Sequence, residues 1–582
     1  MTITAYGAAK PNVPGLYVTI VPPKVNYLSP AQTDILGYVG TAVWGPVNAP
    51  TACSGNADYV SKFGQIQNRA YDMGTGVWAA NLQGAQAFEC VRVTDGTDVA
   101  AFAYLGLLGS PTVAAGGTAY TTSSVLTLSN GAVLNVASVS GGAVVTTTTV
   151  TPPTSKISGS GAVTVVSQTG PGTGATFTFT YTQGITLTSK YTGSGANGDT
   201  AVLAAGSQTG TWKLTIQHPG LATEIYDNIG LGLTANALWG AIVNAVNMGT
   251  AARSFSASMV ATLGTSTTAP SAQTATLAGG SDGVTTITTA IMVGSDSSPR
   301  TGMYALRKTG ASLGVLTDLT DTTSFAAQVA FGLSEGVYMI GATAAGDTIS
   351  NAITTKASAG IDSWAFKYMF GDWIYFQDTV NGLTRLISPQ HFVAGYLAAN
   401  QPQYSSLNQQ LYGIVSTQKQ QTGVPYYDDD LVSLNQAGID VITNPVPGGS
   451  YFGCRMGHNS SSNAVIRGDN YTRMTNFLAA TVNGGCGPYV GALQSQDAVD
   501  ETRSEVKTEL DAFLDDLVTN GALDDFLVTC DLTNNSPTTI AQGKLKVKIK
   551  AVYLSIVEEL DVDIEGGQTV QITRVSTTSA IA

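Results

Sequence analysis

Residues 35–50 read ILGYVGTAVWGPVNAP, an apolar run that ends in a Gly-Pro turn. Such a run predicts a buried strand. A second apolar run, QAFECVRVT, covers residues 86–94. Between the two, residues 57–64 (ADYVSKFG) and 71–84 (YDMGTGVWAANLQG) carry apolar side chains at helical spacing. A strand, a helical segment and a second strand indicate a βαβ layer, so we predict an α/β core.

The same alternation returns over residues 186–440. We expect strands at 211–218 and 363–377 and helices at 238–247 and 388–401. In the last helix, Ser388 is expected to be the N-cap and Pro389 the first helical residue, because serine caps helices and proline tolerates their first position.

Residues 101–185 have a different composition, dominated by Thr, Ser, Gly and Val. The stretch GGAVVTTTTVTPPTSKISGSGAVTVVSQTG, at 141–170, contains a single charged residue. Short alternating strands joined by Gly and Pro turns predict a small inserted β-sandwich that decorates the outside of the protein. A flexible coil is the alternative.

The N-terminal residues 1–22 contain a short β-branched run between prolines. Proline on both sides keeps the chain extended and blocks a helix. The segment is too short to bury its own apolar side chains, so it is expected to be an arm that needs a partner. Its candidate contact residues are Leu16, Tyr17, Val18, Thr19 and Ile20.

Residues 495–521, SQDAVDETRSEVKTELDAFLDDLVTNG, predict a long helix with Ser495 as its cap and Asn520-Gly521 at its end. Its apolar stripe consists of Val499, Val506, Leu510, Phe513, Leu514 and Leu517. Its other face is strongly acidic, and acids in the last turn oppose the helix dipole by about a few tenths of a kcal/mol each. We expect the acidic face to meet a partner, a solvated face being the alternative. The residues concerned are Glu505, Glu509, Asp515 and Asp516.

Two stripes of opposite charge mark residues 543–565, GKLKVKIKAVYLSIVEELDVDIE. In extended strands, alternate residues share a face. One face then carries Lys544, Lys546, Lys548 and Lys550, and a later one carries Glu559, Asp561, Asp563 and Glu565. Same-face lysines lie about 7 Å apart and repel one another unless an acidic surface lies opposite. The stripes are therefore expected to select a partner strand and its register.

The connection between the stripes, AVYLSIV, lacks the residues that suit a tight hairpin. Two pairings stay open. Lys544–Lys550 pairs antiparallel with Glu559–Glu565 in the same chain, or part of residues 555–575 adds as a strand to a sheet of another copy.

Composition bounds the possible functions. The 582 residues are enough for several domains, and 66 glycines with only 11% charged residues are typical of a folded, β-rich protein. A net charge of −13 argues against direct binding of nucleic acid. We find no membrane-spanning run or secretory signal, so synthesis in the cytoplasm without membrane insertion is expected. Five scattered cysteines predict reduced thiols rather than a disulfide framework.

Groups for catalysis are sparse. The motifs GxxxxGK[ST], HExxH and GxSxG do not occur, and His218, His391 and His458 are expected to be structural. Cys454 and His458 lack a second ligand pair, and Asp428–Asp430 are expected to form a solvated turn rather than a cation site. We therefore predict no catalytic residue, no metal site and no cofactor, and a protein that is not an enzyme.

Several segments nevertheless resemble one family. VPGLYVTIV (13–21), ILGYVGTAVWGPVNAP and ADYVSKFG resemble the N-terminal signature of phage contractile tail sheath proteins. Matches to the middle of that family are KYTGSGANGD (190–199), LAGGSDG (277–283) and SPQHFVAGYLAANQ (388–401). Residues 513–564 resemble its C-terminal domain. The matches occur in the right order over most of the chain except about 101–185, whereas CRMGHNSSSNAVIRGDNYTR (454–473) follows the family pattern only loosely.

The resemblance implies an α+β multidomain fold, with an α/β layered core, a C-terminal domain, an inserted small β-sandwich and extended N- and C-terminal strand arms. It implies hexameric rings stacked helically around a tail tube, with the tube, baseplate and tail terminator proteins as partners. The sheath would contract to drive the tube through the host envelope, and the protein would reside in the virion after assembly in the host cytoplasm. The expected domains are an N-terminal arm (1–22), a middle α/β domain (23–100 plus 186–440), an outer β domain (101–185), an inner domain facing the tube (441–560) and a C-terminal arm (561–582).

Two other functions stay open. The chain is the sheath of a phage-like bacteriocin or injection machine, or, with less support, a β-rich adhesin or surface-layer protein suggested by the Thr/Ser-rich insertion. The missing secretion signal and the α/β segments argue against the second.

Overall fold

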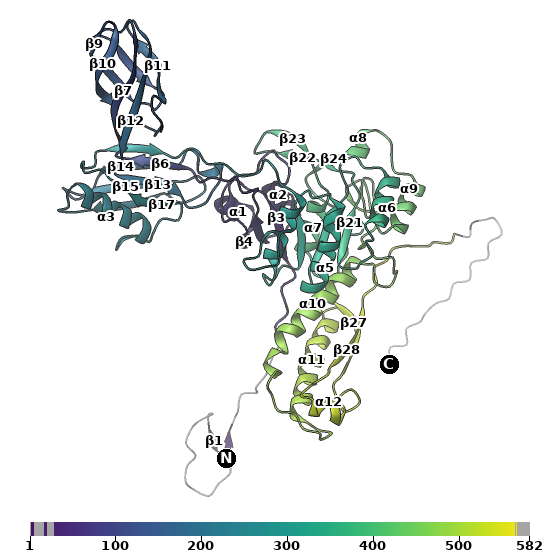
Figure 1. The fold of residues 1–582 in the computed structure, drawn as a ribbon. Coiled ribbons are helices and arrows are strands. Elements are labelled where there is room, and N and C mark those ends of the chain that lie inside the picture. The colour runs from purple at the N-terminus through teal and green to yellow at the C-terminus, as the bar shows by residue number, and fades with distance from the viewer. Residues whose placement is uncertain (1, 5–16, 20–27, 565, 567–582) are drawn as a thin grey trace. The chain divides into compact units, whose positions relative to one another are not determined.

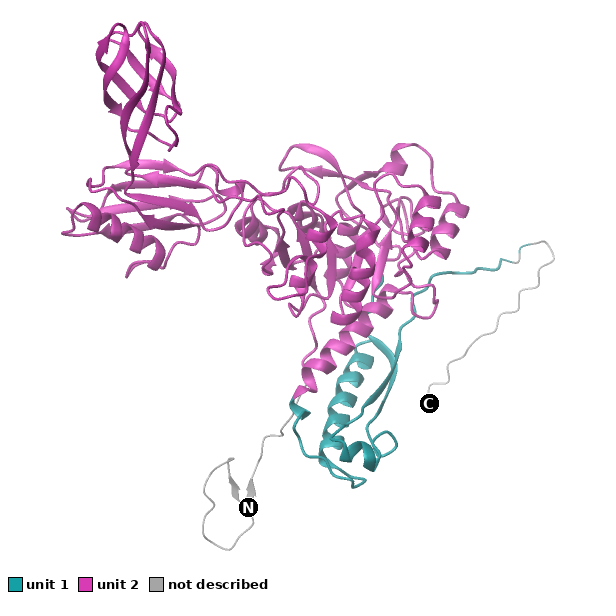
Figure 2. Cartoon of the chain, in the orientation of Figure 1, with its two compact units in different colours: residues 1–27, 403–405, 488–582 teal, residues 28–402, 406–487 magenta. Residues whose placement is uncertain are grey.

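The computed structural model of the chain describes residues 2–4, 17–19, 28–564 and 566. The chain divides into two compact units (Figure 2). The smaller unit comprises residues 1–27, 403–405 and 488–582, and the larger comprises 28–402 and 406–487. Both helices and strands are abundant, so the chain is a mixed α+β protein with several sheets (Figure 1).

The larger unit is built on a six-stranded sheet with the order β21-β20-β19-β3-β5-β4, in which only β4 is antiparallel to its neighbour. The strands are β3 (Ile35–Gly40), β4 (Thr51–Ser54), β5 (Ala87–Arg92), β19 (Leu313–Leu316), β20 (Tyr338–Ala342) and β21 (Phe366–Met369). β3 and β5 flank α1 (Gly55–Phe63) and α2 (Met73–Leu82) in sequence and pair in parallel, which confirms the predicted βαβ layer.

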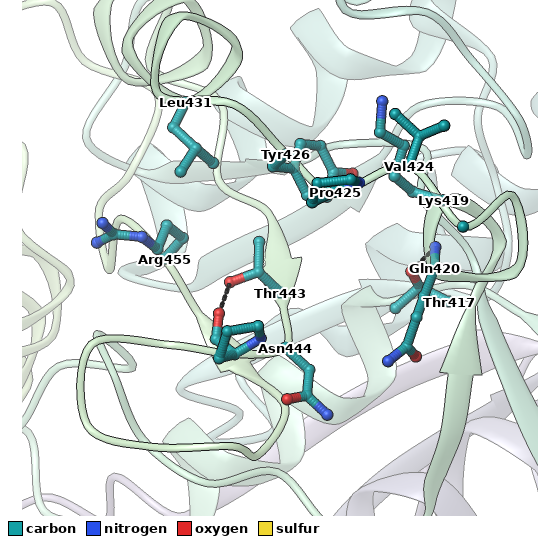
Figure 3. Close-up of a pocket in the computed structure, with 12 residues that line it drawn as sticks. Thr417, Lys419, Gln420, Val424, Pro425, Tyr426, Leu431, Thr443, Asn444 and Arg455 are labelled. Carbon is teal, nitrogen blue, oxygen red and sulfur yellow. Dashed lines mark hydrogen bonds between the residues drawn. The ribbon is translucent and has the colours of Figure 1, made fainter.

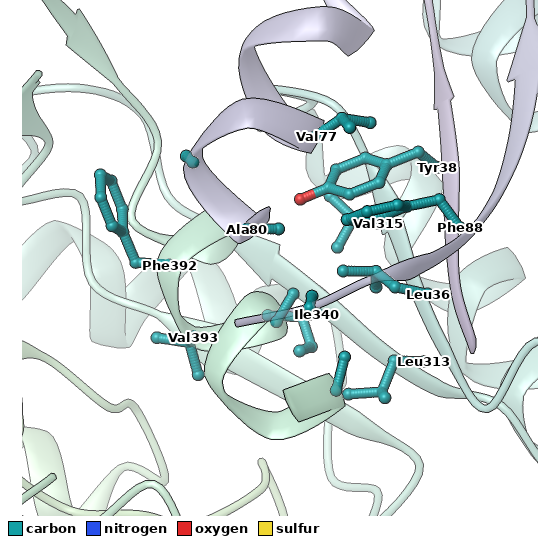
Figure 4. Packing of buried hydrophobic residues seen from close by; sticks show 14 of the residues in the cluster. Leu36, Tyr38, Val77, Ala80, Phe88, Leu313, Val315, Ile340, Phe392 and Val393 are labelled. Carbon is teal, nitrogen blue, oxygen red and sulfur yellow. The ribbon is translucent and has the colours of Figure 1, made fainter. Parts of the chain in front are cut away.

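Both faces of this sheet are buried, as parallel sheets require. Figure 4 shows one face, where Leu36, Tyr38 and Val315 pack with Val77 of α2 and Phe392 of α7 (Gln390–Ala399). The next residues along the same strands, such as Val39 and Leu316, belong to the core on the opposite face, since successive side chains of a strand alternate. Continuous apolar strand sequences are therefore explained by burial on both sides. The opposite face is covered by α4 (Thr289–Val293), α5 (Phe325–Glu335), α6 (Ile349–Ser358) and α9 (Asp428–Gln436).

The helix α7 starts one residue later than predicted. Pro389 is its N-cap and makes no side-chain capping bond, while the buried Ser388 hydroxyl has no hydrogen-bond partner among the described residues. The prediction of Ser388 as the cap is therefore wrong, because its side chain is enclosed by the core instead of turning back to the helix.

A second core of the larger unit joins a three-stranded sheet, β17-β13-β6, and a four-stranded sheet, β16-β15-β14-β18, to α3 (Ala235–Met248). Trp239 of α3 is almost completely buried in this core. The strands are β6 (Phe102–Leu105), β13 (Ile185–Ser189), β14 (Thr200–Ala205), β15 (Trp212–Gln217), β16 (Glu224–Ile229), β17 (Met259–Leu263) and β18 (Gln273–Thr276). The predicted strand at 211–218 and helix at 238–247 are thus confirmed.

Between β6 and β13, six further strands form a sheet with the order β10-β9-β8-β11-β12-β7. They are β7 (Leu108–Thr118), β8 (Val125–Leu128), β9 (Val133–Ser140), β10 (Ala143–Thr151), β11 (Val163–Thr169) and β12 (Thr173–Thr182). Their apolar side chains form a separate core around Phe177 and Leu126. Alternation of Thr with apolar residues, as in β12, places one face in that core and the other outside.

The remaining strands of the larger unit are short. β22 (Ile374–Asp378), β23 (Leu383–Ile387) and β24 (Ile414–Thr417) form a sheet in which β22 is central, and β25 (Ile442–Thr443) pairs with β26 (Gly453–Cys454). The single strand predicted at 363–377 is two strands, β21 and β22, broken at Phe370–Trp373. The helices here are α8 (Gln418–Gln421) and α10 (Asp469–Gly485).

The aspartates at 428–430 form the first turn of α9 rather than a solvated turn. The Asp430 carboxylate accepts from the backbone N–H of Tyr427 at 3.3 Å. Negative side chains in the first turn are favourable because the N-terminus of a helix carries partial positive charge, which explains why three acids stand together.

The smaller unit contains α11 (Glu501–Thr519), β27 (Leu523–Thr529), α12 (Pro537–Ala541) and β28 (Lys548–Tyr553), and the short strands β1 (Thr2–Thr4) and β2 (Tyr17–Thr19). The helix predicted over 495–521 exists, but it starts at Glu501 with Asp500 as its N-cap, so Ser495 is not the cap. Val499 precedes the helix and is 86% exposed, and the prediction that it joins the apolar stripe is wrong. Asn520 and a left-handed Gly521 end the helix as predicted. Among the described residues, no helix has the length and apolar character that a membrane crossing demands.

Candidate assembly surfaces and a candidate pocket

In the smaller unit, β27 packs on α11 and pairs with β28. β27 and β28 are antiparallel, with Val528 opposite Ile549 and Leu527 opposite Lys550. The apolar stripe of α11 is buried at Val506, Leu510, Phe513 and Leu514, whereas Leu517 is half-buried. Among the described residues, no third strand joins β27 and β28, so each of them is an edge strand.

The predicted lysine stripe is partly a strand. Lys548 and Lys550 are exposed and alternate with half-buried Ile549 and Ala551, as predicted for a strand with one packed face. Lys544 and Lys546 precede the strand. The side chain of Asn535 accepts from the Lys546 backbone N–H at 2.6 Å and donates to its carbonyl at 2.8 Å, and this local bonding replaces a strand ladder.

The acidic stripe is not a strand in the described residues. Glu559–Ile564 have no regular structure, and Leu560, Val562 and Ile564 are 82%, 68% and 87% exposed. Because β28 pairs with β27, the pairing of Lys544–Lys550 with Glu559–Glu565 inside one chain does not occur over these residues. The pairing of β28 with β27 accompanies burial of Leu523 and Val528 of β27. Glu565 lies outside the described residues.

The N-terminal arm is described only at its two short strands. β1 and β2 pair in parallel, with Thr2 opposite Tyr17 and Thr4 opposite Thr19. Val18 lies between these two pairs in β2, and Leu16 and Ile20 lie outside the described residues.

The acidic candidates on α11 differ in their surroundings. Glu505, Asp515 and Asp516 are exposed, whereas Glu509 is half-buried and accepts from the Tyr489 hydroxyl at 2.6 Å. Three of the four carboxylates therefore remain available for a partner. The N-terminal end is fixed by Asp500, which accepts from the backbone N–H groups of Arg503 at 3.0 Å and Ser495 at 2.7 Å.

A pocket of 360 Å³ lies in the larger unit, near the end of β24 (Figure 3). Tyr426 and Pro425 lie between Arg455 on one side and Lys419 on the other. The lining contains no acidic residue, and neither cation forms an ion pair among the described residues. Pro445 and Leu431 complete the apolar wall.

The larger unit also encloses a charged cluster that the sequence analysis did not identify. Lys367 of β21 has its ammonium 2.7 Å from an Asp440 carboxylate oxygen and 3.0 Å from one of Asp469, and all three side chains are fully buried. Asp469 also accepts from the hydroxyls of Tyr338 at 2.6 Å and Ser406 at 2.5 Å. A single lysine inside the apolar run WAFKYMF (364–370) is the signal that could have revealed the cluster.

The cluster favours the charged form of its members. Burial by itself would raise the pKa of Asp469, but the Lys367 ammonium and the Ser406 and Tyr338 hydroxyls outweigh it and hold the pKa below its usual value. Burial would likewise lower the pKa of Lys367, yet Asp440 and Asp469 raise it. These groups join β20, β21 and the start of α10 in a buried structural network.

The three histidines have structural partners, as predicted. His218 is 2.7 Å from Asp199, His391 is 3.0 Å from Asp318, and His458 is 3.1 Å from Asn435. Burial lowers the pKa of His458. Over the described part of the chain, no three side chains of His, Cys, Asp or Glu converge as a metal site would require.

Comparison with known proteins finds similarity to phage tail sheath proteins. Residues 461–565 match the family model for the phage tail sheath C-terminal domain. The sheath tail protein of Listeria innocua shares 11% identity with a TM-score of 0.52, over 90% of this chain and 96% of that one. The sheath tail protein of Desulfitobacterium hafniense shares 14% identity with a TM-score of 0.49, over 89% and 93%. The contracted helical sheath of the anti-feeding prophage shares 18% identity with a TM-score of 0.36, over 44% and 69%.

No curated protein sequence matches the chain significantly. At 11% identity the likeness to the Listeria innocua protein establishes a common fold, and the family model matches residues 461–565 only. Residues 461–565 are thus similar to the C-terminal domain of phage tail sheath proteins, which agrees with the resemblance seen in residues 513–564.

Proposed function

We propose that this chain is the structural subunit of a contractile tail sheath, polymerising around a tail tube and contracting to drive it through the host envelope. The observation that carries the proposal is the similarity of residues 461–565 to the tail sheath C-terminal domain. A non-enzymatic, structural role agrees with that family. The partners we propose are further copies of the chain in stacked hexameric rings, a tail tube protein, and baseplate and tail terminator proteins.

The domain division follows the resemblance. We assign residues 1–22 to an N-terminal arm, 23–100 with 186–440 to the middle domain, 101–185 to an outer β domain, 441–560 to an inner domain and 561–582 to a C-terminal arm. The exposed acids of α11, Glu505, Asp515 and Asp516, are assigned to the surface that faces the tube. All three are exposed, and Asp515 and Asp516 also lie near the C-terminal end of α11, where the helix dipole disfavours acids and a positively charged partner would compensate them.

Chain ends provide the links between copies in this proposal. The arm at residues 16–20 and part of 555–575 add as strands to sheets of neighbouring copies, and the edge strands β27 and β28 are available to receive them. Each backbone hydrogen bond formed in this way contributes about 0.5–1.5 kcal/mol. Arms that stay paired while the bodies exchange one set of contacts for another allow contraction without loss of subunits.

Negative-stain microscopy of the purified chain tests the proposal. Hollow cylinders of uniform diameter are expected, and dispersed particles at high concentration would contradict a sheath. Deleting residues 1–22 is expected to leave a folded chain, by circular dichroism, that forms no cylinders. If that variant formed normal cylinders, the N-terminal arm would not be needed for assembly.

The lysine stripe has its own test. Changing Lys548 and Lys550 to Glu keeps strand length and exposure but reverses the charge that a neighbouring copy meets. Assembly is expected to be blocked, while changing the exposed Lys308 to Glu serves as the matched control. Unchanged assembly of the double variant would show that these lysines do not select a partner.

A further inference from the structure

A second cavity, of 660 Å³, shares Tyr426 and Lys419 with the pocket of Figure 3 and therefore adjoins it. Residues 346–349, which follow β20, and residues 370–372, which follow β21, form part of its lining. These two strands are parallel neighbours in the six-stranded sheet, so the cavity lies at their carboxyl ends. Open α/β sheets bind ligands outside the carboxyl ends of their strands, and the cavity has that position.

The cavity has an aromatic wall whose position is fixed by the fold. Phe370, Tyr375 and Tyr426 line it. The rings of Phe370 and Tyr426 meet edge to face, with centroids 6.5 Å apart and planes at 76°. The Tyr426 hydroxyl donates to one carboxylate oxygen of Asp372 at 2.9 Å, and the Lys419 backbone N–H donates to the other at 2.7 Å. Because the wall is already ordered, a ligand that covers it loses little free energy to side-chain ordering.

Polar groups around this wall have hydrogen-bonding capacity that the described residues do not use. The carboxylates of Asp347 and Asp430 each accept hydrogen bonds at one oxygen, and their second oxygens accept none from the described part of the chain. The amide oxygen of Gln418 accepts from two backbone N–H groups, while its NH₂ group donates to no described residue. All three side chains are half-buried and line the cavity, so they offer acceptors and a donor to a ligand.

The charges and spacing of the lining narrow the class of ligand. The carboxylates of Asp347, Asp372 and Asp430 outnumber the single ammonium of Lys419, which disfavours an anion. A metal ion needs acidic ligands that converge, and no such group of three occurs in the described ranges of the chain. An organic cation has no acceptor for the Gln418 amide. A purely apolar ligand would cover the half-buried polar groups without replacing their bonds to water.

A neutral ligand with several hydroxyl groups meets all of these conditions. Each hydroxyl both donates and accepts, so it can bond a carboxylate oxygen and an amide N–H at once. Bonds of this kind to a carboxylate are stronger than those between neutral groups. Pyranose sugars combine such hydroxyls with a face of C–H groups that can pack on an aromatic ring. The volume of the cavity also lies within the range of about 300–1,000 Å³ that is typical of small-molecule sites.

We propose that this cavity binds a neutral saccharide, with one pyranose ring against the wall formed by Tyr375 and Tyr426. Neighbouring hydroxyls of that ring donate to Asp347 and Asp430 and accept from the Gln418 amide. The inference does not depend on the sheath function, because all of these residues belong to one copy of the chain. Free sugars and sugars linked within a polysaccharide share the chemistry that the cavity recognises.

Saturation-transfer NMR with the full chain tests the proposal, because it detects weak binding through the protons of the ligand. The probes are glucose, galactose, mannose and N-acetylglucosamine, together with their methyl glycosides as models of sugars linked in a polysaccharide. At least one probe is expected to bind with a millimolar Kd. Binding of either form supports a saccharide site, and the form that binds more tightly identifies the source of the ligand.

Matched variants of neighbouring aspartates locate the site. Asp430→Asn keeps an acceptor for the first turn of α9 but removes the charge, and it is expected to weaken binding about tenfold. Asp429→Asn changes an exposed neighbour that does not line the cavity, and it is expected to leave binding unchanged. Tyr375→Leu removes one ring of the wall and is also expected to weaken binding. Circular dichroism of each variant checks that the fold is retained.

The proposal would be overturned if no probe bound, or if Asp429→Asn and Asp430→Asn weakened binding equally. Spermidine and Mg²⁺ serve as further probes. If one of these cations bound, Asp430→Asn reduced its binding and no sugar bound, the cavity would be a cation site and the saccharide assignment would be wrong.

Discussion

Replacing Lys367 with methionine tests the buried charged cluster of the larger unit. Methionine fills most of the space of the lysine stem but removes an ammonium that lies 2.7 Å from Asp440 and 3.0 Å from Asp469. Two fully buried carboxylates then lose the cation that pairs with both of them. Loss of one member of a buried ion network costs about 3–5 kcal/mol, and we expect a loss of that size in the free energy of unfolding.

The pH dependence of this loss identifies its cause. In the native chain the lowered pKa of Asp469 contributes stability above the pKa of the unfolded carboxyl, about 3.9, and this contribution disappears as the pH falls through the folded pKa. Without Lys367, burial is expected to dominate and to raise the pKa of Asp469 above the unfolded value. The difference between variant and native chain is therefore expected to shrink from pH 7 to pH 5.

Urea unfolding followed by tryptophan fluorescence measures the loss, because Trp364 and Trp373 flank the run that contains Lys367. Lys308→Met, at an exposed lysine, is the control. Lys367→Met with Asp469→Asn removes one charge of each sign, while Asp440 keeps bonds from the backbone N–H groups of Val441, Met456 and Gly457. The double variant is expected to recover at least about 1 kcal/mol. The reasoning would be refuted if the free energy of unfolding of Lys367→Met lay within about 1 kcal/mol of that of the native chain. It would also be refuted if the double variant were less stable than Lys367→Met.

Three further predictions concern local structure. Asp500→Ala removes the N-cap of α11 and is expected to cost about 1–2 kcal/mol, seen as a lower Tm by circular dichroism; an unchanged Tm would exclude the cap. Lys356, whose pKa burial lowers to about 8, binds fewer protons folded than unfolded between pH 8 and 10, so stability is expected to rise there by at most about 3 kcal/mol. Lys356→Met should flatten that part of the urea profile, and a profile that keeps its rise would contradict the assignment. Gly193→Ala places a Cβ 2.0 Å from the Val43 carbonyl oxygen and is expected to cost about 1–3 kcal/mol more than Gly198→Ala, which shares the positive φ but has open space; equal costs would contradict the steric cause.

Local patterns predicted much of the secondary structure. The apolar runs at 35–50 and 86–94 contain β3 and β5, and their continuous apolar character is typical of strands in a parallel sheet that is covered on both faces. The helical spacing of Val506, Leu510 and Leu514 likewise suffices to place a buried stripe on α11. The predicted first residues of helices were less accurate. Asp500 rather than Ser495 caps α11, because either side chain has the chemistry of a cap and only the path of the preceding chain selects one.

For the candidate sites, too, the sequence predicted local features but not the contacts between distant residues. Alternation of lysines with aliphatic residues predicted the exposed face of β28, but not its partner, since a strand can bond to any edge of suitable register. The pocket at Arg455 and Lys419 joins residues 36 positions apart, and the cluster at Lys367, Asp440 and Asp469 spans more than 100 positions. The local spacing of residues in the sequence does not predict contacts between residues so far apart in the chain.

The sequence by itself determined most of the long helices and the central strands and the faces that they bury, because these follow from periods of two and of about 3.6 residues. Only the tertiary structure decided that β28 pairs with β27, that Lys367 is paired in the core, and that Lys419 and Arg455 line one pocket. The physical reason is that burial and charge pairing depend on distances between residues remote in the chain, and the free energy that selects one set of such contacts is a property of the folded whole.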